Sequence, residues 1–145
     1  MATLPYLNNI ISFNNINKRP KIDKTKVENW LNNVALSEKA QIENLSYNFC
    51  TDEYLLQVNR EHLGHDYYTD IITFDLSDRV GIIEGDLYLS IDRIKDNAML
   101  MGVSFELELL RVMVHGLLHL LGYGDKTKRE IVEMRAKEAK YLAKY

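Results

Sequence analysis

The spacing of apolar residues divides the chain into short strands and amphipathic helices. The apolar residues from Val27 to Val34 recur at helical spacing after Asp23, a residue type that often caps the start of a helix. Those from Leu45 to Phe49 alternate with polar residues, which is typical of a half-buried strand. Applied to the whole chain, this reasoning predicts strands at 10–13, 45–49, 70–75 and 86–91, and helices at about 24–37, 51–64, 92–101, 104–121 and 128–144.

The order of these elements predicts an α+β fold. Strands and helices do not alternate strictly, so we expect a small mixed sheet packed against several helices, one of them a long central helix. The strands at 70–75 and 86–91 are separated by a turn-like stretch, Ser77 to Gly85, and are expected to be neighbours in the sheet. A length of 145 residues suits one domain that spans 1–145.

Composition indicates an ordinary water-soluble protein. Hydrophobic residues make up 46% and charged residues 27% of the chain, and no run is long enough to span a bilayer. One cysteine, Cys50, excludes an internal disulfide and suits the cytoplasm, where we expect an inert, half-buried thiol. The net charge of −3 argues against indiscriminate coating of nucleic acid, although Lys18 and Arg19 open a local basic cluster that reaches Lys26.

The strongest chemical signal is a pair of histidines in the most apolar predicted helix. His115 and His119 are four residues apart, so both imidazoles lie on one helix face and can reach one ion. Gly122 is suited to end this helix in a left-handed turn, which would bring Asp125 back towards the pair. Two histidines and a carboxylate, with a fourth position for water, form a catalytic zinc pattern. The alternative is a pair of hydrogen-bonded core histidines.

Several other residues are candidates for the same site. Arg111 lies one turn before His115, where it either forms an exposed ion pair with Glu108 or binds a substrate phosphate. Asp70 and Asp86 begin strands and are either turn residues or carboxylates that support the metal ligands. Two further histidines, at 62 and 65, are expected at the surface or on the substrate side.

A metalloprotease of the His-Glu-x-x-His type is disfavoured. In those enzymes the glutamate after the first histidine is the general base, and here that position is Gly116. A glycine at this position instead lets another element pack closely against the helix.

The run from His115 to Tyr123 resembles the signature of the endoribonuclease YbeY family of bacterial rRNA maturation factors, His-Gly-x-x-His-Leu-x-Gly-x-Asp-His. Two further blocks agree in order and spacing: 69–74 resembles the family's Pro-Thr-Asp-Val-Leu-Ser-Phe, and 85–90 resembles its Gly-Asp-Ile-x-Ile-Ser. The chain departs from the family at two functional positions. Asp125 stands where the family has its third histidine ligand, with Gly124 before it, and Leu63 stands where the family has an arginine.

The resemblance implies a single-strand-specific, metal-dependent endoribonuclease that acts in rRNA maturation and ribosome quality control. It implies a metal held by His115, His119 and Asp125, most simply one zinc ion per chain, with another divalent transition metal as the alternative. Arg111 and His115 would be catalytic, and Arg111, Lys18 and Arg19 would bind an rRNA precursor. Ribosomal proteins are the other partners implied. Two rival functions stay open, namely a peptidase or amidase on the same metal site, and a ribosome-associated factor whose metal is structural.

Overall fold

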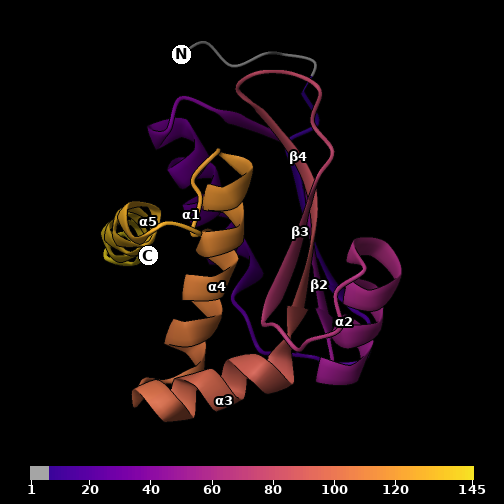
Figure 1. The fold of residues 1–145 in the computed structure, drawn as a ribbon. Helices are drawn as coiled ribbons and strands as arrows, with labels where there is room; N and C mark the ends of the chain where they lie inside the picture. Colours follow the sequence, from indigo (N-terminus) through magenta and orange to yellow (C-terminus); the bar gives the residue numbers. More distant parts are fainter. Residues whose placement is uncertain (1–6) are drawn as a thin grey trace.

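A four-stranded mixed sheet forms the centre of the computed structural model, which describes residues 7–145 (Figure 1). The strands are β1 (Ile10–Asn15), β2 (Gln41–Cys50), β3 (Ile71–Asp75) and β4 (Ile82–Ser90). Their order is β1-β2-β4-β3, with β1, β2 and β4 parallel and the edge strand β3 antiparallel to β4. The predicted α+β fold with a small mixed sheet is confirmed.

Helices cover both faces of this sheet. They are α1 (Lys24–Ser37), α2 (Asp52–Val58), a short π-helical turn η1 (Asn59–Leu63), α3 (Ile91–Met101), α4 (Phe105–Leu120) and α5 (Lys128–Leu142). In Figure 1, α4 lies on one side of the strands and α2 on the other. Among the described residues, no helix is both long and apolar enough to cross a lipid bilayer.

Polar caps set the helix starts that the sequence predicts. Asp23 accepts a hydrogen bond from the Lys26 backbone N–H at 3.1 Å, and Ser104 does the same for Leu107 at 3.1 Å. One prediction was wrong: the stretch 77–85 is not all turn, because β4 already begins at Ile82. The first residues of β4 pair with the start of the long parallel strand β2, about 40 residues earlier in the chain. A pairing between such distant segments cannot be predicted from the turn residues alone.

The core lies between the sheet and the layer formed by α1, α4 and α5. Helix α4 approaches the sheet closely at Gly116, where an added Cβ would overlap a methyl group of Leu87 and lie 2.7 Å from Cδ1 of Ile71. The role expected for this glycine, close packing, is therefore confirmed. Because Gly116 faces the sheet, its neighbour His115 lies at the rim of the helix, with 14% of its side chain exposed.

Cys50 is more deeply placed than the sequence suggests. Its thiol is fully buried and donates to the Leu89 carbonyl at 3.3 Å. Burial, with the nearby charges of Asp92 and Asp52, raises its pKa to about 12, which suits an inert thiol.

Candidate metal centre

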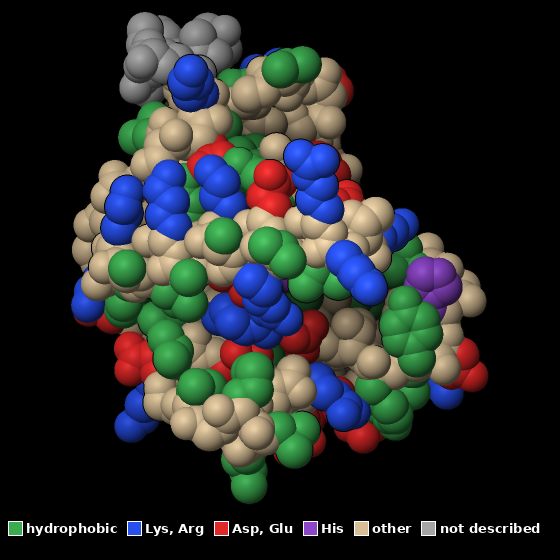
Figure 2. Space-filling view, turned by 60° about the vertical axis from the view of Figure 1, so that its left-hand side comes forward, with side chains coloured by type: hydrophobic (Ala, Val, Ile, Leu, Met, Phe, Trp, Pro, Cys, Tyr) green, Lys and Arg blue, Asp and Glu red, His purple; other side chains and the backbone are tan. Residues whose placement is uncertain are grey.

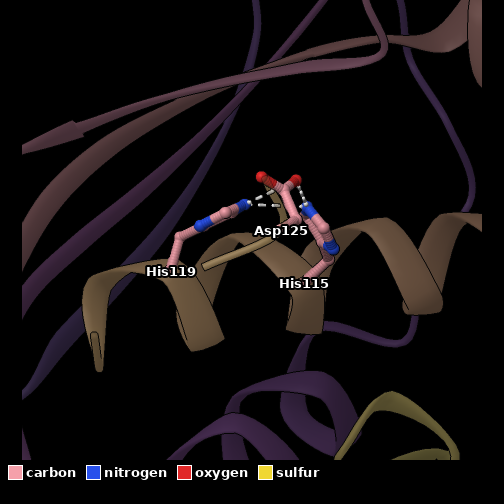
Figure 3. A group of neighbouring side chains, drawn as sticks. All are labelled: His115, His119 and Asp125. Atoms are coloured by element: carbon pink, nitrogen blue, oxygen red, sulfur yellow. Dashed lines mark hydrogen bonds and ion pairs between the residues drawn. The ribbon is translucent and has the colours of Figure 1, made fainter. Parts of the chain in front are cut away.

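His115, His119 and Asp125 converge at the C-terminal half of α4. The imidazoles rise from the helix and point towards one another, and the Asp125 carboxylate lies over the gap between them (Figure 3). The Nε2 atoms of the two histidines are 3.0 Å apart. Oδ2 of Asp125 lies 3.4 Å from Nε2 of His115 and 3.2 Å from Nε2 of His119. The three ligand atoms all lie within 4.8 Å of one another, so one ion can contact all three.

The turn after α4 places the carboxylate. Gly122 has a φ of +105°, a left-handed conformation that suits glycine, and its N–H donates to the His119 carbonyl at 3.0 Å. The chain then folds back over the helix end, as the position of Gly122 predicts.

Side chains from two other helices hold this turn. The Tyr123 hydroxyl donates to Glu38, the C-cap residue of α1, at 2.5 Å. Glu130 of α5 accepts from the Thr127 backbone N–H at 2.9 Å, and its carboxylate fills the space where a Cβ on Gly124 would lie. A larger residue at position 124, such as the family's aspartate, would displace Glu130.

Glu138 of α5 orients the first histidine, and the sequence analysis missed it. Its Oε2 lies 2.6 Å from Nδ1 of His115, so this nitrogen donates and the Nε2 lone pair faces His119 and Asp125. A signal was present: Glu138 lies four residues after Met134 and three before Tyr141, so it occupies a position in the buried stripe of an amphipathic helix. A carboxylate in such a buried stripe is expected to accept hydrogen bonds from a cationic or N–H donor, because an unpaired buried charge is costly.

Glu138 stays ionised although it is only 2% exposed. Burial raises its pKa, but hydrogen bonds from His115 and Arg135 and the charge of Arg111 outweigh that effect and lower it to about 2. Its negative charge therefore favours a proton on Nδ1 of His115 over one on Nε2.

The donor set fits a divalent metal ion. With the proton of His115 on Nδ1, its Nε2 lone pair faces a second imidazole nitrogen and a carboxylate oxygen at 3.0–3.4 Å. Without an ion, a proton on Nε2 of His119 can bridge these atoms by donating to His115 or Asp125, and a metal ion would take the place of that proton. Two imidazoles and one carboxylate, with a buried carboxylate behind one imidazole, match zinc and related transition metals.

Arg111 takes part in a buried ion-pair network. Its Nε and Nη2 donate to the two oxygens of Glu108 at 2.7 and 2.8 Å, and its Nη1 donates to Glu138 at 3.1 Å. The predicted pair with Glu108 is confirmed, but the expectation that it is exposed was wrong, since Glu108 is 1% exposed. Burial acts to lower the pKa of Arg111, but the two carboxylates raise it above its ordinary value. The predicted phosphate contact of Arg111 stays a prediction.

The two strand aspartates lie in different places. Asp70 is on the metal side, with Oδ2 3.9 Å from Nη2 of Arg111, and burial raises its pKa against the opposing charges of Arg111 and His115. Asp86 is on the opposite face of the sheet, because Gly85 and Leu87 face α4 and strand residues alternate. The expectation that Asp86 supports the metal ligands is therefore corrected.

The basic cluster predicted to bind RNA does not join the metal centre. Lys18 forms an ion pair with Asp92 at 2.8 Å, and Arg19 lies beside Phe105 at the first turn of α4. His115 is ten residues further along that helix, which is about 15 Å. His62 and His65 are both exposed, and His62 lines a pocket beside α2 on the face of the sheet opposite α4.

Comparison with known proteins agrees with this geometry. The sequence profile of the family Endoribonuclease YbeY matches residues 11–145. The Endoribonuclease YbeY of Cytophaga hutchinsonii is 58% identical over 115 residues, which cover 79% of this chain and 80% of that protein. The one from Bacteroides thetaiotaomicron is 46% identical over 128 residues, 87% of this chain and 91% of that one.

The fold agrees as well. A protein of Thermotoga maritima with a known solution structure matches with a TM-score of 0.64 and 26% identity, over 92% of this chain and 87% of that protein. The profile match covers the α4 histidines and the turn to Asp125, and so includes the whole candidate metal centre. The resemblance expected from the three sequence blocks is confirmed, and the chain belongs to the endoribonuclease YbeY family.

Proposed function

We propose that the protein is a metal-dependent endoribonuclease that cuts single-stranded RNA during rRNA maturation and ribosome quality control in the cytoplasm. Residues 1–145 act as one domain, with rRNA precursors and ribosomal proteins as partners. The observation that carries the proposal is the convergence of His115, His119 and Asp125 within 4.8 Å in a chain of this family.

His115, His119 and Asp125 would hold one zinc ion. When bound, a divalent metal polarises a phosphate oxygen or increases the acidity of water. Glu138 keeps the His115 proton on Nδ1, and the close packing at Gly116 fixes the height of α4 above the sheet. Because the third ligand is a carboxylate and not a third imidazole, the site carries one more negative charge than three histidines would give it.

Cationic side chains beside the site suit a phosphate backbone. Arg111 is 17% exposed and is the cation nearest to the metal ligands along α4, which supports the phosphate contact predicted for it. Helix α5 follows Asp125 directly and carries Lys128, Arg129, Arg135, Lys137 and Lys140. The face on which α5 lies gathers several Lys and Arg side chains (Figure 2). These residues, together with Lys18 and Arg19 further along, would attract an RNA strand.

Elemental analysis of the purified protein combined with an RNA cleavage assay tests the proposal. We expect about one zinc per chain and cleavage of a labelled single strand, but not of a duplex or of peptide libraries. His119→Ala should lose both metal and cleavage, whereas His65→Ala, a histidine outside the site, should keep both. Cleavage of peptides instead of RNA, or full activity of His119→Ala, would contradict the proposal.

A further inference from the structure

A pocket lies on the sheet face opposite the metal centre. It has a volume of about 360 Å³ and lies between α2 with η1 on one side and strands β3 and β4 on the other. Four aromatic or imidazole side chains line it, from Tyr54, His62, Phe74 and Tyr88, together with the carboxylates of Asp86 and Glu61. The family signature blocks contribute Phe74 and Asp86 to this pocket, yet neither is close to the metal ligands.

The rings form a connected apolar wall. Phe74 packs edge to face against Tyr88, with ring centroids 6.0 Å apart, and against His62, with centroids 5.9 Å apart. Phe74 and Asp86 are directly paired across β3 and β4, so the carboxylate lies beside the aromatic wall. A flat ring entering the pocket would meet both at once.

Three polar groups of the pocket lack partners within the described part of the chain, whereas Gln57 at its edge donates to Glu61 at 2.6 Å. In residues 7–145, the half-buried Asp86 carboxylate makes no hydrogen bond or ion pair, and neither do the hydroxyls of Tyr54 and Tyr88. Burial and the Asp86 charge raise the pKa of Tyr88, so its hydroxyl keeps its proton. A concave apolar site with a few convergent, unpaired polar groups is the usual form of a small-ligand site.

The chemistry of the pocket selects among the RNA bases. An ionised carboxylate accepts hydrogen bonds only, and it binds best to two parallel N–H donors. The Watson–Crick edge of guanine offers N1–H and N2–H side by side, whereas none of the other three bases has two adjacent donor positions on that edge. No Lys or Arg lines the pocket, so a phosphate has no counter-charge there.

The edge strand β3 connects this pocket to the metal centre. Ile71 and Thr73 face Gly116 of α4, while the alternating residues Ile72 and Phe74 face the other way. Since β3 is five residues long and lies at the edge of the sheet, a single strand that bends around it can reach both faces.

We propose that the pocket binds a guanine base of the RNA substrate, with Asp86 accepting hydrogen bonds from N1 and N2 and the aromatic wall packing against the ring. The site would give the nuclease a preference for guanosine near the cut. This inference rests on the proposed function for its source of guanine, but the binding of a free nucleotide tests the pocket separately.

Calorimetric titration of the full, metal-loaded protein with GMP, IMP, AMP, CMP and UMP is the first experiment. All five carry the same phosphate, so differences among them report the base. We expect GMP to bind most tightly, and IMP, which lacks the 2-amino group, to bind about tenfold more weakly. Asp86→Asn should weaken GMP binding about 10- to 100-fold while keeping bound metal. The matched control is Glu84→Gln, on the same strand and outside the pocket, which should bind GMP like the parent.

The second experiment compares cleavage of a single strand with that of the same strand carrying inosine at each guanosine in turn. At one of these positions in the RNA, inosine should slow cleavage by the parent protein but not by the Asp86→Asn variant. Equal affinity for all five nucleotides, or tighter binding of free L-arginine than of GMP, would overturn the pocket proposal even if RNA is cut. Selective GMP binding by a protein that cuts no RNA would instead refute the proposed function and leave the pocket standing.

Discussion

Replacing Gly116 with alanine should destabilise the protein, although alanine is the better helix former. In the middle of a helix, Gly→Ala alone would stabilise by about 1 kcal/mol. Here the new methyl group would overlap Cδ2 of Leu87 and lie 2.7 Å from Cδ1 of Ile71. Leu87 is fully buried, so it has no solvent to move into.

The size of the loss follows from these opposing effects. Overpacking by one methyl group in a dense core costs about 1–3 kcal/mol, which exceeds the gain in helix propensity over most of that range. After subtraction of the helix gain, we expect a net loss of up to about 2 kcal/mol, or up to about 8 °C in the melting temperature of a domain of this size. Because α4 must move away from the sheet, His115 should also shift relative to Glu138, and metal affinity should fall.

Thermal unfolding monitored by circular dichroism, together with metal competition against a chelator, measures both effects. Asn33→Ala is the control, since Asn33 is exposed in the middle of α1 and reports helix propensity alone. The control should be slightly stabilised. A Gly116→Ala protein as stable as the Asn33→Ala control would show that the helix is not pressed against the sheet, and the reasoning would fail.

Three further perturbations address the network around the metal centre. Glu138→Gln should lower metal affinity about 10- to 100-fold in chelator competition. The control, Glu133→Gln at an exposed position of the same helix, should leave the affinity unchanged. Equal affinities of the two variants would show that Glu138 does not position His115. Arg111→Ala should lower the free energy of unfolding by about 3–5 kcal/mol, measured by chemical denaturation, because it leaves Glu108 buried without its cation. A loss below about 0.5 kcal/mol would mean that the pair behaves like an exposed one. Burial raises the pKa of Glu38, but hydrogen bonds from Tyr123, Tyr141 and Lys137 outweigh burial and hold the pKa of the folded protein below the ordinary value of 4.5. Ionised Glu38 therefore stabilises the fold above pH 4.5, and this stabilisation is lost as the pH falls through the lower pKa of the folded protein. Glu38→Gln should remove that part of the acid destabilisation, and an unchanged pH dependence of unfolding would contradict this assignment.

Local patterns were sufficient to predict the helix that carries the histidines and the turn that follows it. The spacing of His115 and His119 and the position of Gly122 can be read from one short stretch of sequence. For the same reason the capped starts of α1 and α4 were predicted correctly. Asp125 was placed beside the histidines from the direction of the turn alone, and its distances bear this out.

Contacts between distant segments were not predictable in the same way. Glu138 lies 23 residues after His115, and the Glu38 cluster joins α1 to a turn 85 residues later. Asp86 was assigned to the wrong face because β4 is largely buried on both sides, so its apolar pattern does not reveal which residues face α4. One residue of register decides whether Asp86 faces the metal centre or the pocket beside α2, and the packing of Gly85 against Leu120 and of Leu87 against Gly116 settles it.

Helix α5 makes the metal centre sensitive to local opening. Three of its side chains are buried, and one of those three is the charged Glu138, so little apolar surface holds the helix in place. If α5 detached, His115 would lose its carboxylate and Glu38 would lose Lys137 and Tyr141 in the same event. Detached and docked chains should then differ in metal affinity, and by linkage the metal should favour the docked form. At a free metal concentration 100 times the dissociation constant, opening would become about 100-fold rarer if only the docked form binds the ion. Amide exchange and proteolysis in α5 would then respond to metal supply, so that the availability of the ion would govern the lifetime of the chain as well as its catalysis.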